Sequence, residues 1–98
     1  MDPDAAVLED AARAVTAIDL KYRRASFDEK RELKKDRDRA FTVYTMARRR
    51  LLEDGVLCGK ADVEEMKGIR KEVSRARKVQ SIIVAARRFV VFLARVLM

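Results

Sequence analysis

The C-terminal segment VSRARKVQSIIVAARRFVVFLARVLM, residues 73–98, constrains the fold more than any other part of the chain. It holds six basic residues, seventeen apolar residues and no Asp, Glu, Gly or Pro. Because neither helix breaker is present, nothing in the segment stops a helix. A wide apolar face on a purely cationic helix indicates a surface for an anionic ligand, a partner helix that covers the apolar side chains, or both.

The rest of the chain also favours helices. Only three Gly and one Pro are available for turns in 98 residues, and apolar residues recur at helical spacing nearly throughout. We therefore expect one all-α domain over residues 1–98. Its predicted architecture is an elongated, coiled-coil-like bundle of three helices, in which a helical hairpin is joined by an N-terminal helix.

Capping residues and Gly55 predict the bounds of three helices. The first spans about 3–25 and starts after Asp2 as N-cap. The second spans about 27–54, opens with a Ser26–Glu29 capping box and ends at Gly55, although an unbroken helix through residue 26 stays open. A loop follows over 55–61. The third helix is expected over about 63–98, where Asp62 and Glu65 repeat the capping pattern.

The apolar surface of the predicted third helix indicates a homodimer. In an antiparallel hairpin, residues 79–98 would face the charged run 28–39, whose one apolar residue is Leu33. One chain would then leave much apolar surface in water, and a second copy would cover it. The predicted interface comprises Val79, Ile82, Ile83, Ala86, Phe89, Val90, Leu93 and Leu97.

Regularly spaced arginines predict the functional surface. On one continuous helix Arg70, Arg77, Arg88 and Arg95 would form a narrow stripe beside Ser74 and Ser81. Arg and Ser are common phosphate contacts, so the stripe indicates binding to the backbone of a DNA or RNA duplex without strong sequence preference. Arg48, Arg49 and Arg50 would assist. The alternatives are a solvated helix face for the stripe and a favourable interaction with the helix dipole for the triplet.

Other functions rest on weaker signals. A docking site for another protein on the apolar C-terminal helix, or peripheral binding to an anionic membrane, would use the same residues. Membrane insertion is disfavoured because Arg87, Arg88 and Arg95 would enter the bilayer. With no His, one Cys and no nucleotide-binding motif, we expect no enzymatic activity, no metal site and no cofactor. The single Cys and the acidic N-terminus indicate a cytoplasmic protein.

Overall fold

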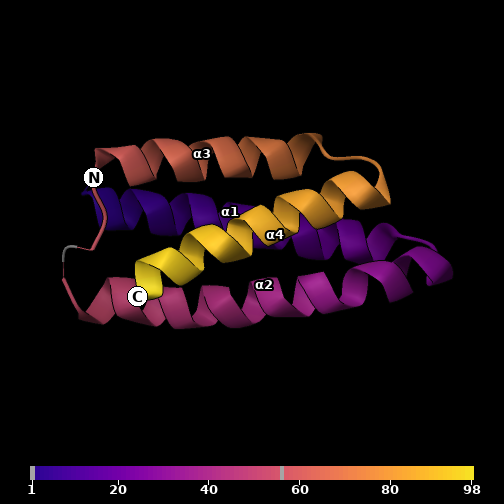
Figure 1. Cartoon of the computed structure of the whole chain (residues 1–98), viewed down its shortest axis with the longest axis horizontal. Helices are drawn as coiled ribbons and strands as arrows, with labels where there is room; N and C mark the ends of the chain where they lie inside the picture. The colour runs from indigo at the N-terminus through magenta and orange to yellow at the C-terminus, as the bar shows by residue number, and fades with distance from the viewer. Residues whose placement is uncertain (1, 56) are drawn as a thin grey trace.

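The computed structural model describes residues 2–55 and 57–98, which form four helices and no strand (Figure 1). The helices are α1 (Pro3–Arg24), α2 (Phe27–Glu53), α3 (Lys60–Arg75) and α4 (Val79–Leu97). The all-α prediction is confirmed, whereas the prediction of three helices is wrong. The molecule is a rod with extents of 41 × 21 × 18 Å.

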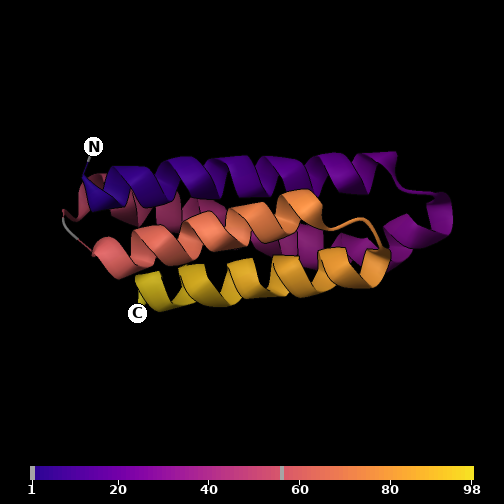
Figure 2. The ribbon, with the colours of Figure 1, turned by 90° about the horizontal axis from the view of Figure 1, so that it is seen from above.

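The four helices occupy the corners of a bundle in the order α1, α2, α4, α3. Contacts join α1 to α2 and α3, and α4 to α2 and α3, while α2 and α3 lie on a diagonal without contact. Figures 1 and 2 together show α3 above the other helices and α2 on the opposite side. The predicted hairpin of neighbouring helices about the 55–61 loop is therefore wrong, because the chain crosses the end of the bundle after α2.

The bundle has two different ends. At the turn end lie the short α1–α2 and α3–α4 connections, and the N-terminal part of α2 extends beyond the α3–α4 connection (Figure 1). At the loop end lie both termini and the longer α2–α3 connection (Figure 2). Neighbouring helices α1 and α3 run in the same direction, as do α2 and α4.

Side-chain caps explain the first two helix starts and confirm their prediction. The Asp2 carboxylate accepts a hydrogen bond from the backbone N–H of Ala5 at 2.8 Å. Between α1 and α2, the Ser26 hydroxyl accepts from the Glu29 N–H, and the Glu29 carboxylate accepts from the Ser26 N–H at 2.9 Å. This capping box settles the open question in favour of a break. Gly55, with φ of +85°, follows α2 as predicted.

The predicted helix over 63–98 is wrong at both its start and its middle. It begins at Lys60, because the Asp62 carboxylate accepts from the Gly59 N–H and so caps the helix three residues earlier. It ends at Arg75, and the extended residue Ala76 starts a turn that leads to α4 at Val79. The predicted loop 55–61 is shortened accordingly; Val56 within it lies outside the described residues.

Burial explains why the chain turns at residue 76, although no Gly or Pro lies in residues 73–98. Breaking a helix gives up about four hydrogen bonds, each contributing about 1 kcal/mol net. The turn in exchange folds α4 back onto the bundle, where Phe89, Phe92 and Leu93 are almost completely buried, and each large side chain contributes about 1.5–3 kcal/mol. Lys21 stabilises the turn, since its ammonium donates to the Ala76 carbonyl at 2.6 Å.

The folded-back α4 also accounts for the residues predicted to form a dimer interface. Ile82, Ile83, Ala86, Phe89 and Leu93 are buried within the single chain, and the other three, Val79, Val90 and Leu97, are half-buried. Ala86, Phe89 and Leu93 lie in the main core with Val7, Ala40 and Met66, against which Val90 and Leu97 pack. Ile82 and Ile83 form a second cluster with Leu33 and Ala76, against which Val79 packs. One chain therefore covers the surface for which the sequence had suggested a second copy.

Asp4 holds the α2–α3 connection across the end of the bundle. This buried carboxylate accepts hydrogen bonds from the backbone N–H groups of Leu57, at 3.0 Å, and Cys58, at 2.8 Å. Ionised acceptors make stronger hydrogen bonds than neutral ones. The connection can therefore lie over the core at the loop end without leaving these two donors unpaired.

Candidate nucleic-acid interface

The four arginines of the predicted stripe lie on two helices and the turn between them, and they do not form one row. Because the chain turns at residue 76, Arg70 belongs to α3, while Arg88 and Arg95 belong to α4. Arg70 turns towards α1 and pairs with Asp10 at 2.7 Å. Arg88 and Arg95 turn towards α3, where they pair with Glu72 and, at 2.5 Å, Glu65. These three arginines bind helices to one another.

Arg77 differs from the other three stripe residues. It lies exposed in the α3–α4 turn and makes no ion pair in the described part of the chain. Ser74, near the end of α3, and Ser81, in the first turn of α4, are exposed on either side of it. The structure therefore keeps one arginine and both hydroxyls of the predicted stripe together at the turn end.

The Arg48–Arg50 triplet is divided among three surroundings at the loop end. Arg48 is exposed on the α1 side of α2, beside a shallow hollow that Tyr44 also lines. Arg49 pairs with Glu53 at 3.4 Å along the helix. Arg50 donates to the Leu97 carbonyl at 2.9 Å and pairs with Asp54, so it ties the end of α4 to α2. The triplet is not a common surface with Arg77.

The positive charge is concentrated at the turn end. The halves of the four helices nearest this end, residues 14–40 and 68–88, hold 16 Lys or Arg against seven Asp or Glu. The remaining residues hold seven Lys or Arg against nine Asp or Glu. The rod is thus strongly basic at one end and slightly acidic at the other, which orients it in the field of a polyanion.

Cations without an ion pair are distributed even more unevenly between the two halves of the rod. Within residues 2–55 and 57–98, eleven of the 23 basic side chains bind a carboxylate or, for Lys21, a backbone carbonyl. Of the twelve others, nine lie in the basic half: Arg24, Lys30, Arg31, Lys35, Arg39, Lys71, Arg75, Arg77 and Lys78. A cation without a carboxylate partner can bind phosphate without first breaking an ion pair.

Five of these nine residues surround the α3–α4 turn, and we call them the turn cation cluster: Arg24, Lys71, Arg75, Arg77 and Lys78. All five are exposed. Arg24 comes from the end of α1 and lines, with Arg77, a hollow of about 310 Å³ between the two turns. The cluster therefore combines cations from α1, α3 and the turn.

The first turn of α4 adds backbone donors to this cluster. No side chain caps it, and its first hydrogen bond to the turn is from the Ile82 N–H to the Lys78 carbonyl. The N–H groups at such a helix start carry partial positive charge and bind phosphate oxygens. Ser81 brings a hydroxyl to the same turn.

Sequence reasoning missed Arg24, Lys71, Arg75 and Lys78. A signal for three of them was present, because the run 71–78 has Glu72 as its one acid, and Glu72 is neutralised by Arg88. The helical wheel hid the signal by placing Arg75 and Lys78 away from the assumed stripe. Arg24 could not be found in this way, since its position beside Arg77 depends on the folding of the whole bundle.

Other chemistry finds little support in the described residues. Burial raises the pKa of the Cys58 thiol to about 12, and the nearby Asp4 and Asp62 carboxylates add to the effect, so the thiol is protonated at neutral pH. Among the described residues no group of three or more Cys, Asp or Glu is placed to hold a metal ion. None of the helices in this part of the chain has the length and apolar character needed to cross a bilayer.

Comparisons with known proteins add no family to this description. No family model, no curated protein and no solved structure matches the chain. The fold and the charge distribution therefore define it as a small four-helix protein with one strongly basic end.

Proposed function

We propose that this chain is a non-enzymatic protein that binds the phosphate backbone of duplex nucleic acid through the turn cation cluster. The observation that carries the proposal is the gathering of five exposed, unpaired cations around the α3–α4 turn. Phosphate contacts supply most of the sequence-independent affinity for DNA and RNA. The proposal keeps Arg77, Ser74 and Ser81 of the sequence-based site and leaves Arg70, Arg88 and Arg95 to their ion pairs.

Two further features support binding to a duplex rather than to single strands. The cluster consists of cations, hydroxyls and helix-start N–H groups, which contact the backbone and do not read base edges. The exposed aromatic side chain at the start of α2, Phe27, would stack a single base, whereas proteins that bind single strands stack successive bases on several aromatic rings. The expected recognition is of charge and shape.

Salt dependence tests the proposal directly. If the five cations of the cluster each contact one phosphate, log affinity for a random 20-base-pair duplex should fall with log salt at a slope of about −4 to −5. Fluorescence anisotropy over about 0.05–0.3 M KCl gives this slope. No detectable binding at about 0.05 M KCl would refute the proposal.

Matched double variants test the location. Arg75→Gln with Arg77→Gln should reduce the slope by about 2 and the affinity near 0.1 M salt by about 50-fold. Lys60→Gln with Lys67→Gln changes the net charge equally, at two exposed and unpaired positions of the other half of α3, and should cost less than threefold. Equal losses in the two variants would show that total charge, not the cluster, governs binding.

A homodimer would need a surface other than the one expected from the sequence. Three exposed apolar residues follow one another at intervals of seven: Val84 and Val91 of α4, and Met98 directly after it. Such a row is typical of a helix–helix contact. Sedimentation equilibrium of the free chain tests it, and a single species of 11.3 kDa at about 200 µM would exclude self-association.

A cytoplasmic location and the absence of enzymatic activity belong to the same proposal. The protonated, buried state of Cys58 supports a structural role for this thiol. The surface of an anionic membrane is the alternative ligand for the same cations. Binding to phosphatidylserine vesicles in preference to duplex, at equal salt, would favour it.

A further inference from the structure

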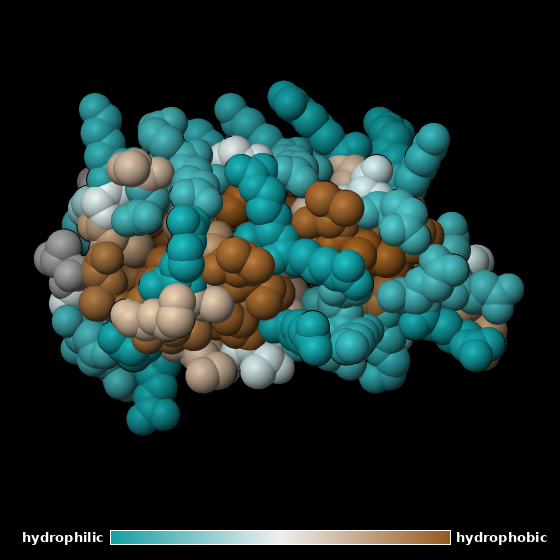
Figure 3. Space-filling view, in the orientation of Figure 1, coloured by the Kyte–Doolittle hydropathy of each residue, from teal (hydrophilic) through white to brown (hydrophobic). Residues whose placement is uncertain are grey.

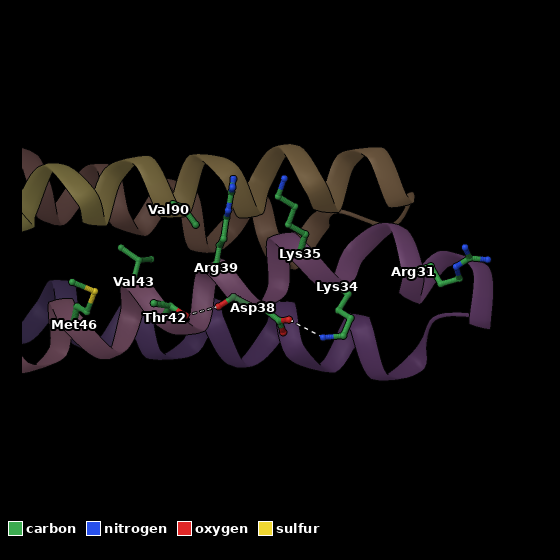
Figure 4. Close-up of a pocket in the computed structure, with 9 residues that line it drawn as sticks. All are labelled: Arg31, Lys34, Lys35, Asp38, Arg39, Thr42, Val43, Met46 and Val90. Carbon is green, nitrogen blue, oxygen red and sulfur yellow. Dashed lines mark hydrogen bonds and ion pairs between the residues drawn. The ribbon is translucent and has the colours of Figure 1, made fainter.

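An open groove of about 690 Å³ runs between α2 and α4, separate from the turn cation cluster. Figure 4 shows its lining, in which Val43 of α2 and Val90 of α4 lie opposite each other, with Met46 further along α2. Towards the turn end the lining changes to basic side chains. The groove therefore has an apolar part and a cationic part, one after the other along α2.

The apolar part of the groove leaves apolar side chains exposed that the core does not cover. Val43 and Val90 are half-buried at the edge of the core, while the Met46 side chain is 55 % exposed. Figure 3 shows apolar surface along the middle of this face, over α4 and its boundary with α2. Apolar surface that is concave and continuous is characteristic of a docking site.

The cationic part is a row on one edge of α2. Arg31, Lys35 and Arg39 follow at intervals of four residues and so share one helix face, and Val43 continues the same interval. All three cations are exposed and without a carboxylate partner in the described structure. Figure 4 shows Lys35 and Arg39 extending towards α4. The neighbouring Lys34, by contrast, pairs with Asp38 at 3.0 Å.

We propose that this groove docks an acidic amphipathic helix of a partner protein. Apolar side chains of that helix would pack on Val43, Met46 and Val90, while its Asp or Glu side chains would pair with Arg31, Lys35 and Arg39. From Arg31 to Met46 the groove edge is about 22 Å long, which matches about four turns of a helix. A helix laid in an apolar groove is a recurrent mode of peptide recognition.

The shape and the charge pattern select this occupant over two others. A bilayer surface is met by several apolar side chains that protrude together. Of the three apolar residues that line the groove, Val43 and Val90 are recessed between two helices, and Met46 alone is exposed. A duplex backbone would satisfy the cations but leave the apolar part of the groove in water. Only a ligand that is both acidic and apolar, with the width of a helix, uses both parts at once.

A designed peptide is the probe for the test. It is a fluorescein-labelled 18-residue helix with Leu on one face and Glu along one edge of that face, and its counterpart carries Lys in place of each Glu. Anisotropy is measured with the full chain in 0.15 M KCl. The Glu peptide should bind at least tenfold tighter than the Lys peptide, and equal affinities would overturn the proposal.

Variants of the groove locate the binding. Met46→Asp, at an exposed position that leaves the core intact, and Lys35→Glu with Arg39→Glu should each weaken the Glu peptide at least tenfold. Arg48→Glu serves as control, because Arg48 is an exposed, unpaired cation of the same helix on its α1 side. Circular dichroism confirms that each variant is folded. Unchanged affinity in both groove variants would overturn the proposal.

Methyl NMR separates the groove from the other surfaces. The Glu peptide should shift the methyl signals of Val43 and Val90 and leave that of Val84 in place. Shifts confined to Val84 would overturn the proposal. It would also be overturned if vesicles or duplex displaced the peptide and if their own binding were weakened by the Met46 and Arg39 substitutions as much as that of the peptide. The groove and the turn cation cluster share no residue, so either proposal can fail while the other stands.

Discussion

Removal of the Asp4 carboxylate should destabilise the bundle more than any other single truncation of an acidic side chain at the loop end. Asp4 binds the backbone N–H groups of Leu57 and Cys58, and no other acceptor in the described structure replaces it. Hydrogen bonds to an ionised group contribute about 1.5–3 kcal/mol each. Asp4→Ala should therefore lower the free energy of unfolding by about 3 kcal/mol, the lower bound for two such bonds, because water can reach the half-buried Leu57 amide.

Asp2→Ala is the matched control. Asp2 lies two residues away in the same helix start and accepts one hydrogen bond, from Ala5, as an ordinary N-cap. Its loss should cost about 1 kcal/mol. With a urea m value of about 1.5 kcal/mol/M, the unfolding midpoint should fall by about 2 M in Asp4→Ala and by less than about 1 M in Asp2→Ala.

The Cys58 thiol gives a second, local readout of the same change. Cys58 is 4 % exposed and belongs to the connection that Asp4 holds, so its thiol reacts with a thiol reagent only when that connection opens. A local loss of about 3 kcal/mol raises the open population, and with it the labelling rate, about a hundredfold. Equal midpoints in the two variants, or unchanged labelling in Asp4→Ala, would refute the role assigned to Asp4.

Further changes test the core, the turn and the ionisable groups. The free energy of unfolding should fall as the pH rises from about 9 towards 12, because unfolded Cys58 ionises at its ordinary pKa of 9.0 while burial holds the folded pKa near 12; the fall should be smaller in Cys58→Ala when urea midpoints are compared at pH 8 and 10.5. Arg87→Met should cost about 1–2 kcal/mol, because it leaves the buried Asp36 carboxylate unpaired, and adding Asp36→Leu should restore most of that loss in urea melts. Lys21→Met should lower the thermal midpoint by several degrees and speed hydrogen exchange in the α3–α4 turn, whose Ala76 carbonyl it binds. Phe89→Ala should cost about 3–5 kcal/mol at any protein concentration; a cost that vanished on dilution would place Phe89 between chains and not within one.

Local signals predicted the ends of the first two helices, because those ends are decided by neighbouring residues. Asp2, Ser26, Glu29 and Gly55 lie within three residues of the N–H or C=O groups that they satisfy or the turn that they allow. The all-α class followed from helical spacing. The start of α3 was misplaced by three residues because Asp62 can serve either as N-cap or as the N3 residue of an earlier start, and the sequence pattern fits both.

The turn at Ala76 could not be predicted in this way, because no residue there breaks a helix. It is selected by tertiary packing: α4 gains more from burial of Phe89, Phe92 and Leu93 in the bundle than it loses at the break. Its stabilising contact comes from Lys21, more than fifty residues earlier in the chain. A sequence pattern analysed one segment at a time contains neither the burial of α4 nor the contact with Lys21.

The same turn explains why the arginine stripe was a poor guide to the binding surface. A helical wheel presents side chains as if they all faced solvent, and it assumes that the axis continues. Once α4 folds back antiparallel to α3, Glu65 and Glu72 come to lie beside Arg95 and Arg88, whose charges they neutralise. Acids that are absent from residues 73–98 are thus supplied by α3 and, for Arg87, by Asp36 of α2. The exposed cations of this segment that remain without an ion pair in the described structure are Arg75, Arg77 and Lys78, all at the turn. In a bundle with an acid-free helix, the free positive charge is therefore best sought at the ends of that helix and not along its face.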